Sequence, residues 1–353
     1  MYGMKSRDGS LCLFPDVAEL SRGAVGREGA QSPPAAAEAS APAGSERVQF
    51  RPLACSTVLN ENANRALPFR WTINPYRGCE FDCSYCFARY THAYLGNNDP
   101  GAFESRIYVK FQAAQVLAET LRPAAIRGHS IAMGTATDPY QPAEKRFEIT
   151  RRLLEVLSRC PDVDLSITTK STLVVRDIDL LRDINRRGRV AVQITMLTLN
   201  PALTRIVERR TPPPRLRLET IRALHAAGIE VGLFVMPLLP GINDSADEMR
   251  ALLRAARDAG VSYAVADPLR LPGPSRAVFE RVLLRHFPHL LGLYRSQAVL
   301  RRGSLEGPAH PVLERFHAIR EAIGLRADSA ARASRAPHPV GSGWLFDPID
   351  STG

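Results

Sequence analysis

Apolar and β-branched stretches alternate along the chain with segments whose apolar residues recur at helical spacing. Each apolar stretch ends in a polar or Gly/Pro-containing loop, which is typical of strands, and the intervening segments follow the three- and four-residue spacing of one helix face. The predicted strands are Trp71–Tyr76, Ser130–Thr137, Leu165–Thr169, Val190–Thr198, Val231–Leu239 and Tyr263–Asp267. The predicted helices are Phe111–Leu121, Glu144–Leu157, Ile178–Arg187, Arg217–Ala227, Ala246–Ala259 and Arg276–Arg285.

This alternation predicts a parallel sheet whose strands are joined by right-handed helical crossovers. The stretches near Ile131, Ile167, Ile194 and Val235 are apolar nearly throughout, which is typical of strands covered on both faces. A dinucleotide-binding sheet would show the same alternation, but the sequence contains neither a G-x-G-x-x-G turn nor a Walker loop. We therefore expect an α/β fold built as a partial (β/α)6 barrel, with its chemistry at the carboxyl ends of the strands.

Composition separates the ends of the chain from its middle. Residues 22–47 are mostly Ala, Gly, Pro, Ser and Glu without apolar periodicity, and such a segment buries too little surface to offset its ordering entropy. We predict a flexible N-terminal segment over residues 1–47, the barrel over 48–272, a small C-terminal helical extension over 273–326 and a flexible tail over 327–353.

The whole chain has 353 residues, of which 45% are hydrophobic and 23% charged, as in an ordinary globular protein. The longest apolar stretch, residues 231–240, is about half as long as a membrane-spanning helix requires. No basic-then-apolar leader opens the chain. We expect a cytoplasmic protein without a membrane partner.

The formal net charge is +10 at pH 7, and arginine supplies nearly all of the positive charge. A basic surface attracts polyanions, but these arginines are spread over many segments, so a nucleic-acid partner and a merely solvated surface both stay open. One group, Arg205, Arg209, Arg210 and Arg215, follows the fourth predicted strand. This group forms either a cationic rim at the barrel mouth that recognises phosphate or carboxylate, or a solvated face.

Three of the six cysteines lie in one short loop directly after the first predicted strand. Cys79, Cys83 and Cys86 have the spacing C-x3-C-x2-C, which in a reducing compartment indicates metal binding or catalysis. Three thiolates can hold three irons of a four-iron cluster and leave the fourth iron open. A zinc site with His92 as the fourth ligand is the alternative, although no second short Cys or His pair follows.

Further motifs accompany this loop. They are Asn74–Cys79 (NPYRGC), Cys86–Arg89 (CFAR), Thr91–Gly96 (THAYLG), Thr137–Glu144 (TDPYQPAE), Thr168–Ser171 (TTKS) and Pro240–Asp244 (PGIND). Together with the cysteines they resemble the radical SAM superfamily, and within it a branch related to spore photoproduct lyase. The resemblance implies a barrel of the radical SAM type, a [4Fe–4S] cluster and S-adenosylmethionine (SAM) as cofactors, and reductive cleavage of SAM to a 5′-deoxyadenosyl radical.

Transferred position by position, the resemblance implies a cofactor-binding set of Cys79, Cys83, Cys86, Tyr85, Thr137, Asp138, Lys170 and Thr195. The cysteines would hold the cluster, and the backbone at Tyr85 would face the adenine. A lysine at a strand end can neutralise a carboxylate, and hydroxyls can bridge ribose or amino groups, although Lys170 could equally be a surface charge. Asp138 and Glu144 are candidates for orienting SAM or substrate, and Glu144 fits equally well as an acid at a helix N-terminus.

Two positions depart from spore photoproduct lyase, which has a Tyr directly after its third cluster Cys and a Cys in its second strand. Both residues return a hydrogen atom to the thymine product in that enzyme. Here the two positions hold Phe87 and Thr135, and neither a phenyl group nor an alcohol is a good hydrogen donor to a carbon radical. We therefore expect thymine-dimer reversal by that route to fail, and we assign no catalytic residue.

The leading prediction is a radical SAM enzyme that acts on an unidentified substrate and takes its electron from a reductant such as flavodoxin or ferredoxin. One alternative is a lesion-repair enzyme like spore photoproduct lyase. An alternative of another class is a non-catalytic iron–sulfur or zinc module that binds nucleic acid. Lys170, Thr137 and Thr195 favour the enzyme, because a binding module has no need of a SAM pocket.

Overall fold

The protein is described from a computed structural model that covers residues 48–62, 67–97, 99, 101–271, 273–296 and 311–329. Its main sheet has the order β10-β9-β8-β7-β6-β3-β2. The strands are β2 (Asn60–Glu61), β3 (Trp71–Ile73), β6 (Ser130–Met133), β7 (Asp164–Thr169), β8 (Arg189–Thr195), β9 (Glu230–Leu238) and β10 (Tyr263–Pro268). All neighbours pair in parallel except β2, which runs antiparallel to β3. Because β10 and β2 form the two edges, the six parallel strands make an open, partial (β/α)6 barrel, as predicted.

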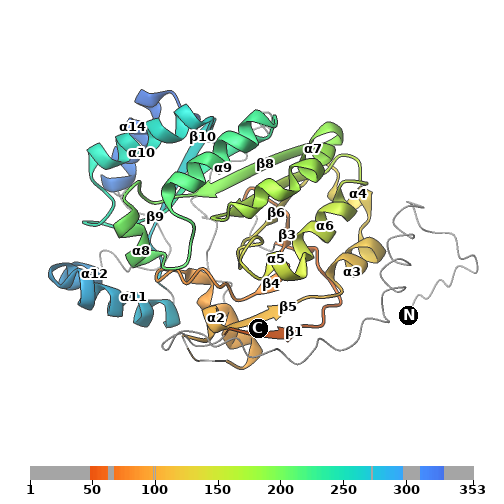
Figure 1. Cartoon of the computed structure of the whole chain (residues 1–353), viewed down its shortest axis with the longest axis horizontal. Coiled ribbons are helices and arrows are strands. Elements are labelled where there is room, and N and C mark those ends of the chain that lie inside the picture. Colours follow the sequence, from red (N-terminus) through yellow and green to blue (C-terminus); the bar gives the residue numbers. More distant parts are fainter. Residues whose placement is uncertain are drawn as a thin grey trace, which may run out of the picture.

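Helices follow the strands and cover the outer face of the sheet (Figure 1). They are α3 (Ala113–Thr120), α4 (Pro123–Ile126), α5 (Glu144–Phe147), α6 (Ile149–Leu157), η2 (Leu173–Asp177), α7 (Ile178–Arg187), α8 (Pro201–Val207), α9 (Pro214–Ala226) and α10 (Ala246–Ala259). The single helix predicted over residues 144–157 is divided, because Glu148 adopts a left-handed φ of 52° between α5 and α6.

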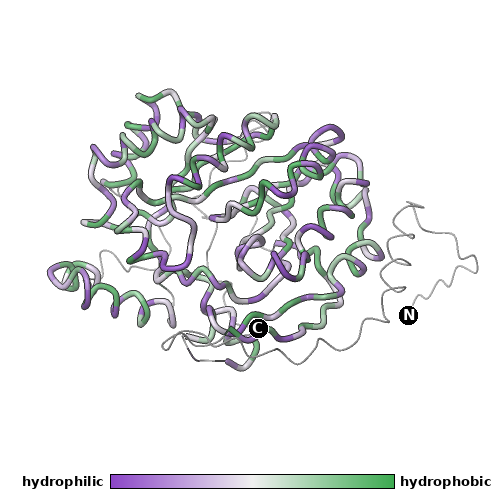
Figure 2. The backbone as a smooth tube through the Cα atoms, in the orientation of Figure 1, coloured by the Kyte–Doolittle hydropathy of each residue, from purple (hydrophilic) through white to green (hydrophobic). Residues whose placement is uncertain are grey.

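The two faces of the strands differ in chemistry. Residues such as Ile131, Ile167 and Val192 point outward and are fully buried in the core beneath the helices, where Figure 2 shows mainly hydrophobic strands. The alternate, inward-facing positions line a cavity and are mostly small or polar: Ala132, Ser166, Thr168, Ala191, Gln193, Thr195, Phe234, Met236, Tyr263, Val265 and Asp267. The inner face is thus less apolar than the sequence pattern predicts, and it leaves room inside the barrel.

A second, three-stranded sheet lies beside the cysteine loop and was not predicted. It has the order β1 (Gln49–Pro52), β5 (Arg106–Val109), β4 (Tyr76–Arg77). The predicted first strand over residues 71–76 is therefore two strands, β3 and β4. The 3-10 helix η1 (Phe87–Leu95) and the short helix α2 (Ala102–Ser105) precede β5. Together these elements surround the loop from residue 78 to residue 86.

The C-terminal part of the described chain is mainly helical, as predicted. It contains α11 (Gly273–His286), η3 (Pro288–Leu290), α12 (Leu291–Arg295) and α14 (Pro311–Ile323). Helix α14 packs on α10 and β10, while α11 packs on η1. The predicted segment 1–47 and most of the predicted tail lie outside the described residues, and the boundary at residues 272–273 stays a prediction. Within the described ranges, none of the helices has the length and apolar character needed to cross a membrane.

Candidate active site

The cysteine loop begins at a backbone position that only glycine can occupy without strain. Gly78 has a φ of +83°, and a Cβ there would lie 2.8 Å from the carbonyl oxygens of both Phe103 and Arg106. The next residue, Cys79, donates its backbone N–H to the Phe103 oxygen at 2.9 Å. Helix α2 and strand β5 therefore fix the start of the loop.

The end of α8 and the segment that follows it hold the middle of the loop. The backbone N–H of Ser84 donates to the Val207 oxygen at 2.9 Å, and that of Arg210 donates to the Phe81 oxygen at 3.2 Å. Between these bonds, Cys83 and Glu208 form an antiparallel β-bridge. Residues more than 120 positions apart are thereby joined edge to edge.

Residues after β6 support the loop from a third side. Thr137 donates its hydroxyl to the Gly78 oxygen at 2.6 Å, and Gln141 Nε2 donates to the same oxygen at 3.0 Å. Gln141 Oε1 also accepts the backbone N–H of Glu80 at 3.0 Å. The motif after β6 thus positions the cysteine loop, whereas a contact between Thr137 and SAM stays a prediction.

A buried arginine lies behind the loop. Arg89, 2% exposed, donates from Nη2 to the Cys83 oxygen at 3.0 Å and from Nη1 to Glu104. Its guanidinium also lies 3.6 Å from the carboxylate of Asp82 and over the ring of Phe103. The sequence motif contained Arg89, but only the structure shows that it braces the loop backbone.

All of the predicted cofactor-binding residues line one cavity of about 230 Å³. Its lining includes Cys79, Cys83, Cys86, Tyr85, Thr137, Asp138, Lys170 and Thr195. The carboxyl ends of parallel strands converge at one end of a barrel, which is why residues scattered over the sequence meet here. The cavity continues inward to a polar group in which Gln193 Oε1 accepts from Ser166 Oγ at 2.9 Å and Gln193 Nε2 donates to the Tyr263 hydroxyl at 2.6 Å.

Asp138 and Lys170 lie together at the ends of β6 and β7. The Asp138 carboxylate accepts the Thr169 hydroxyl at 2.7 Å and the backbone N–H of Lys170 at 2.8 Å. The Lys170 ammonium lies 5.8 Å from the centre of the Tyr85 ring. Burial alone would lower the pKa of Lys170, but the neighbouring acidic groups, Cys83 when it is ionised, Glu208 and Asp138, raise that pKa. Lys170 therefore remains a cation at this wall of the cavity.

Glu208 and Arg217 also reach the site, and the sequence analysis did not identify them. Both are nearly inaccessible, at 2% and 1% exposure. Glu208 accepts the hydroxyl of Tyr85 and pairs with Arg217, which donates to the Thr195 oxygen at 2.9 Å. Burial would raise the pKa of Glu208, but Arg217 and Lys170 hold it below its usual value. Both residues lie in or beside an arginine-rich stretch that is more typical of a solvated surface.

The arginine group predicted as a cationic rim does not form one. Arg209 pairs with Asp82 at 2.7 Å and Arg215 pairs with Glu219. Arg205 donates to the Arg209 oxygen at 3.3 Å. The arginines that do line the cavity are Arg189 and Arg270. None of the four predicted arginines lines the cavity, so the structure favours the other alternative, a solvated arginine face, over a cationic rim.

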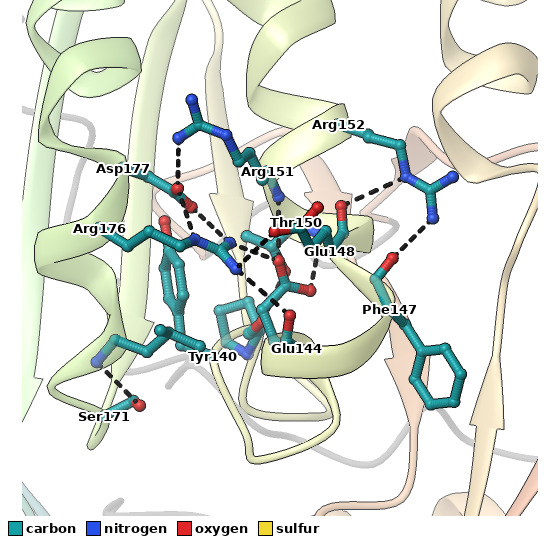
Figure 3. A network of polar contacts seen from close by, with 12 residues as sticks. Tyr140, Glu144, Phe147, Glu148, Thr150, Arg151, Arg152, Ser171, Arg176 and Asp177 are labelled. Atoms are coloured by element: carbon teal, nitrogen blue, oxygen red, sulfur yellow. Dashed lines mark hydrogen bonds and ion pairs between the residues drawn. The ribbon is translucent and has the colours of Figure 1, made fainter. Parts of the chain in front are cut away.

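Glu144 is structural. Its fully buried carboxylate accepts the Tyr76 hydroxyl at 2.5 Å, the Arg176 guanidinium at 2.7 Å and the backbone N–H of Thr150 at 2.9 Å (Figure 3). It also accepts the backbone N–H of Arg151 at 3.1 Å, so it caps the N-terminus of α6. Glu144 does not line the cavity, which confirms the helix N-terminus alternative.

A family model decides the classification. The model of the radical SAM superfamily matches residues 73–256, which include the cysteine loop and the strands from β4 to β9. The chain belongs to the radical SAM superfamily. Enzymes of this superfamily use a [4Fe–4S] cluster and SAM, and they need an electron donor.

The relatives of this radical SAM protein carry no assigned function. The uncharacterized protein Rv2578c of Mycobacterium tuberculosis is 38% identical over 264 residues, which cover 74% of this chain and 77% of that protein. The uncharacterized protein MJ0683 of Methanocaldococcus jannaschii is 30% identical over 175 residues, covering 50% and 62%. Among solved structures, spore photoproduct lyase complexed with dinucleoside spore photoproduct matches with a TM-score of 0.56 at 15% identity, covering 78% and 79% of the two chains. That match supports the fold.

The fourth ligand of the alternative zinc site does not lie at the cavity with the three thiols of this radical SAM protein. His92, the proposed fourth zinc ligand, does not line the cavity and has Nε2 3.0 Å from the Arg106 oxygen. Burial raises the pKa of all three loop cysteines, so their thiolates need a metal to persist.

Proposed function

We propose that this protein reductively cleaves SAM at a [4Fe–4S] cluster held by Cys79, Cys83 and Cys86, and that the resulting 5′-deoxyadenosyl radical acts on a substrate in the barrel. The observation that carries the proposal is the single cavity that contains the three thiols and extends into the barrel interior. A bound cluster and SAM would supply one-electron reductive cleavage of the S–C5′ bond of SAM, with methionine and the 5′-deoxyadenosyl radical as products.

The chain's own residues bind and orient SAM and shield the cluster. Lys170 offers a cation to the SAM carboxylate, and the Thr195 hydroxyl faces the same cavity. Apolar side chains pack around the cysteine loop, among them Phe81, Phe103 and Phe279, each at most 3% exposed. They keep water and oxygen away from the cluster position. The electron comes from a small carrier such as flavodoxin or ferredoxin.

The decisive experiment is anaerobic. The protein is reconstituted with iron and sulfide, mixed with dithionite and SAM, and assayed for 5′-deoxyadenosine and methionine. We expect equal amounts of both, none without dithionite, and none from Cys86→Ala. Stoichiometric zinc in place of iron, or an iron-loaded protein that leaves SAM intact, would refute the proposal.

Repair of spore photoproduct is a second candidate, favoured by the fold match to spore photoproduct lyase and by the net charge of +10. Charge supplies affinity for nucleic acid but no chemistry. Phe87 and Thr135 both line the cavity, at the positions where that enzyme has its hydrogen-returning residues. We therefore expect SAM cleavage without repair when an oligonucleotide carrying the lesion is added. Multiple-turnover repair would instead establish the lyase function.

A further inference from the structure

One buried carboxylate joins three parts of the candidate site. Glu208 follows α8, and its Oε1 accepts the hydroxyl of Tyr85. Its Oε2 accepts Arg217 Nη2 at 2.5 Å and the Thr211 hydroxyl at 3.3 Å. Arg217, on α9, donates in turn to the Thr195 oxygen at 2.9 Å and to the Pro212 oxygen at 2.8 Å. The carboxylate therefore connects the cysteine loop to the carboxyl end of β8.

Tyr85, whose hydroxyl Glu208 accepts, lies beside both the predicted cluster ligands and Lys170. Tyr85 lies between Cys83 and Cys86 in the loop, and its ring faces the Lys170 ammonium at 5.8 Å. Tyr85, Lys170 and Thr195 come from three different segments, and all of them line the cavity. A change in the Tyr85 ring would shift the loop backbone on one side and the environment of the lysine on the other.

Stability alone does not account for such a pair. A buried ion pair is weak evidence of stabilisation, because apolar residues of similar volume often serve as well. What two directional hydrogen bonds on separate carboxylate oxygens do supply is a fixed geometry. We infer that Glu208 is a positioning residue of the SAM site, which fixes the Tyr85 side chain and the Thr195 end of β8 relative to one another. This inference rests on the proposed function.

The chain offers a matched control in Glu144. It too is a buried glutamate that accepts a tyrosine hydroxyl, from Tyr76, and pairs with an arginine, Arg176. Figure 3 shows Glu144 together with Arg176 and Thr150, two of its partners, and neither Glu144 nor Arg176 lines the cavity. Replacing Glu144 therefore removes the same kind of network without touching the cavity.

The test compares Glu208→Gln, Glu144→Gln, Tyr85→Phe and the double variant of Glu208 and Tyr85. Iron content, thermal midpoint, the SAM dissociation constant by equilibrium dialysis, and the change that SAM causes in the EPR spectrum of the reduced cluster are measured for each. We expect Glu208→Gln and Tyr85→Phe to keep their iron and to weaken SAM binding about tenfold, the size of one lost charge-assisted hydrogen bond. The double variant should be no weaker than either single variant. Glu144→Gln should lower the thermal midpoint but change SAM affinity less than about twofold.

The outcomes separate the inference from the proposed function. If the wild-type protein carries iron but binds no SAM, the proposed function fails. If the wild type binds SAM while Glu208→Gln and Glu144→Gln affect binding equally, or the losses from Glu208 and Tyr85 simply add, the positioning role is refuted. Should Glu208→Gln take up no iron, Tyr85→Phe decides, because it removes one hydroxyl and leaves the ion pair in place. Unchanged SAM affinity and an unchanged EPR response in that variant would overturn the inference.

Discussion

Replacing Gly78 with alanine should dislodge the cysteine loop at its first residue. The left-handed φ of +83° costs a residue with a side chain about 1–2 kcal/mol. The added Cβ would also lie 2.8 Å from two carbonyl oxygens and 3.1 Å from a His92 ring carbon. Relieving that overlap breaks the 2.9 Å bond from Cys79 N–H to the Phe103 oxygen, which is worth about 1 kcal/mol. We expect a loss of about 3 kcal/mol in unfolding free energy and much lower iron uptake.

Gly96 provides the matched comparison. It has a φ of +70°, but a Cβ there would meet nothing within 4 Å, so Gly96→Ala should cost only about 1 kcal/mol. The change in unfolded-chain entropy is the same for both substitutions, so the difference between them isolates the contacts at Gly78. Urea denaturation of the iron-free variants and iron analysis after reconstitution measure the two effects. Equal stability and equal iron in the two variants would refute this reasoning.

Three further predictions concern the site and its surroundings. Replacing Cys79, Cys83 or Cys86 with Ala should abolish most iron and sulfide uptake, because two thiolates hold the cluster poorly, whereas Cys160→Ala, in the core, should leave uptake unchanged. Lys170→Ala should keep the iron but weaken SAM binding in equilibrium dialysis, because it removes a cation and no iron ligand; unchanged affinity would show that the assignment of Lys170 is wrong. Lys110→Met should raise the denaturation midpoint at pH 7, because burial first, and then the charge of Arg77, lower the pKa of Lys110 from 10.5 to about 8. Between pH 8 and pH 10.5 the unfolded chain keeps a proton on Lys110 that the folded chain has released, so the free energy of unfolding rises with pH over this range. The burial of the charged lysine therefore lowers the free energy of unfolding by about 3 kcal/mol below pH 8, and this loss disappears as pH rises toward 10.5. A midpoint of Lys110→Met that falls at pH 7 would contradict this.

The sequence predicted those features whose cause is local or periodic. Strands β6 to β9 each lie in an apolar or β-branched stretch that ends in a polar or Gly/Pro-containing loop, so each strand could be located from the sequence. The family resemblance assigned Lys170 and Thr195 to one site, and the rule that parallel strands end at the same side of a barrel is consistent with that assignment. Their position at the cavity agrees with that reasoning.

The features that escaped prediction depend on contacts between distant segments. Glu208 meets Tyr85 across 123 positions, and charged residues in an arginine-rich stretch are usually exposed. The small sheet of β1, β5 and β4 has strands of two to four residues, too short for a period to be detected. The break between α5 and α6 goes together with the capping of α6 by the Glu144 side chain. The spacing of apolar residues along a helix gives no sign of such a cap.

Three separate elements contact the backbone of the cysteine loop. Helix α2 holds Cys79, the end of α8 and the segment after it hold residues 83 and 84, and Ser275 of α11 donates to the Cys86 oxygen at 2.7 Å. In small zinc domains the metal itself drives folding, whereas here these contacts also contribute to the position of the loop. The segment after α8 also carries Glu208, which contacts Tyr85, and the motif after β6 contacts both Gly78 of the loop and Lys170. Positioning of the cluster and positioning of SAM are therefore two results of one set of contacts, and a substitution that loosens the loop will affect both.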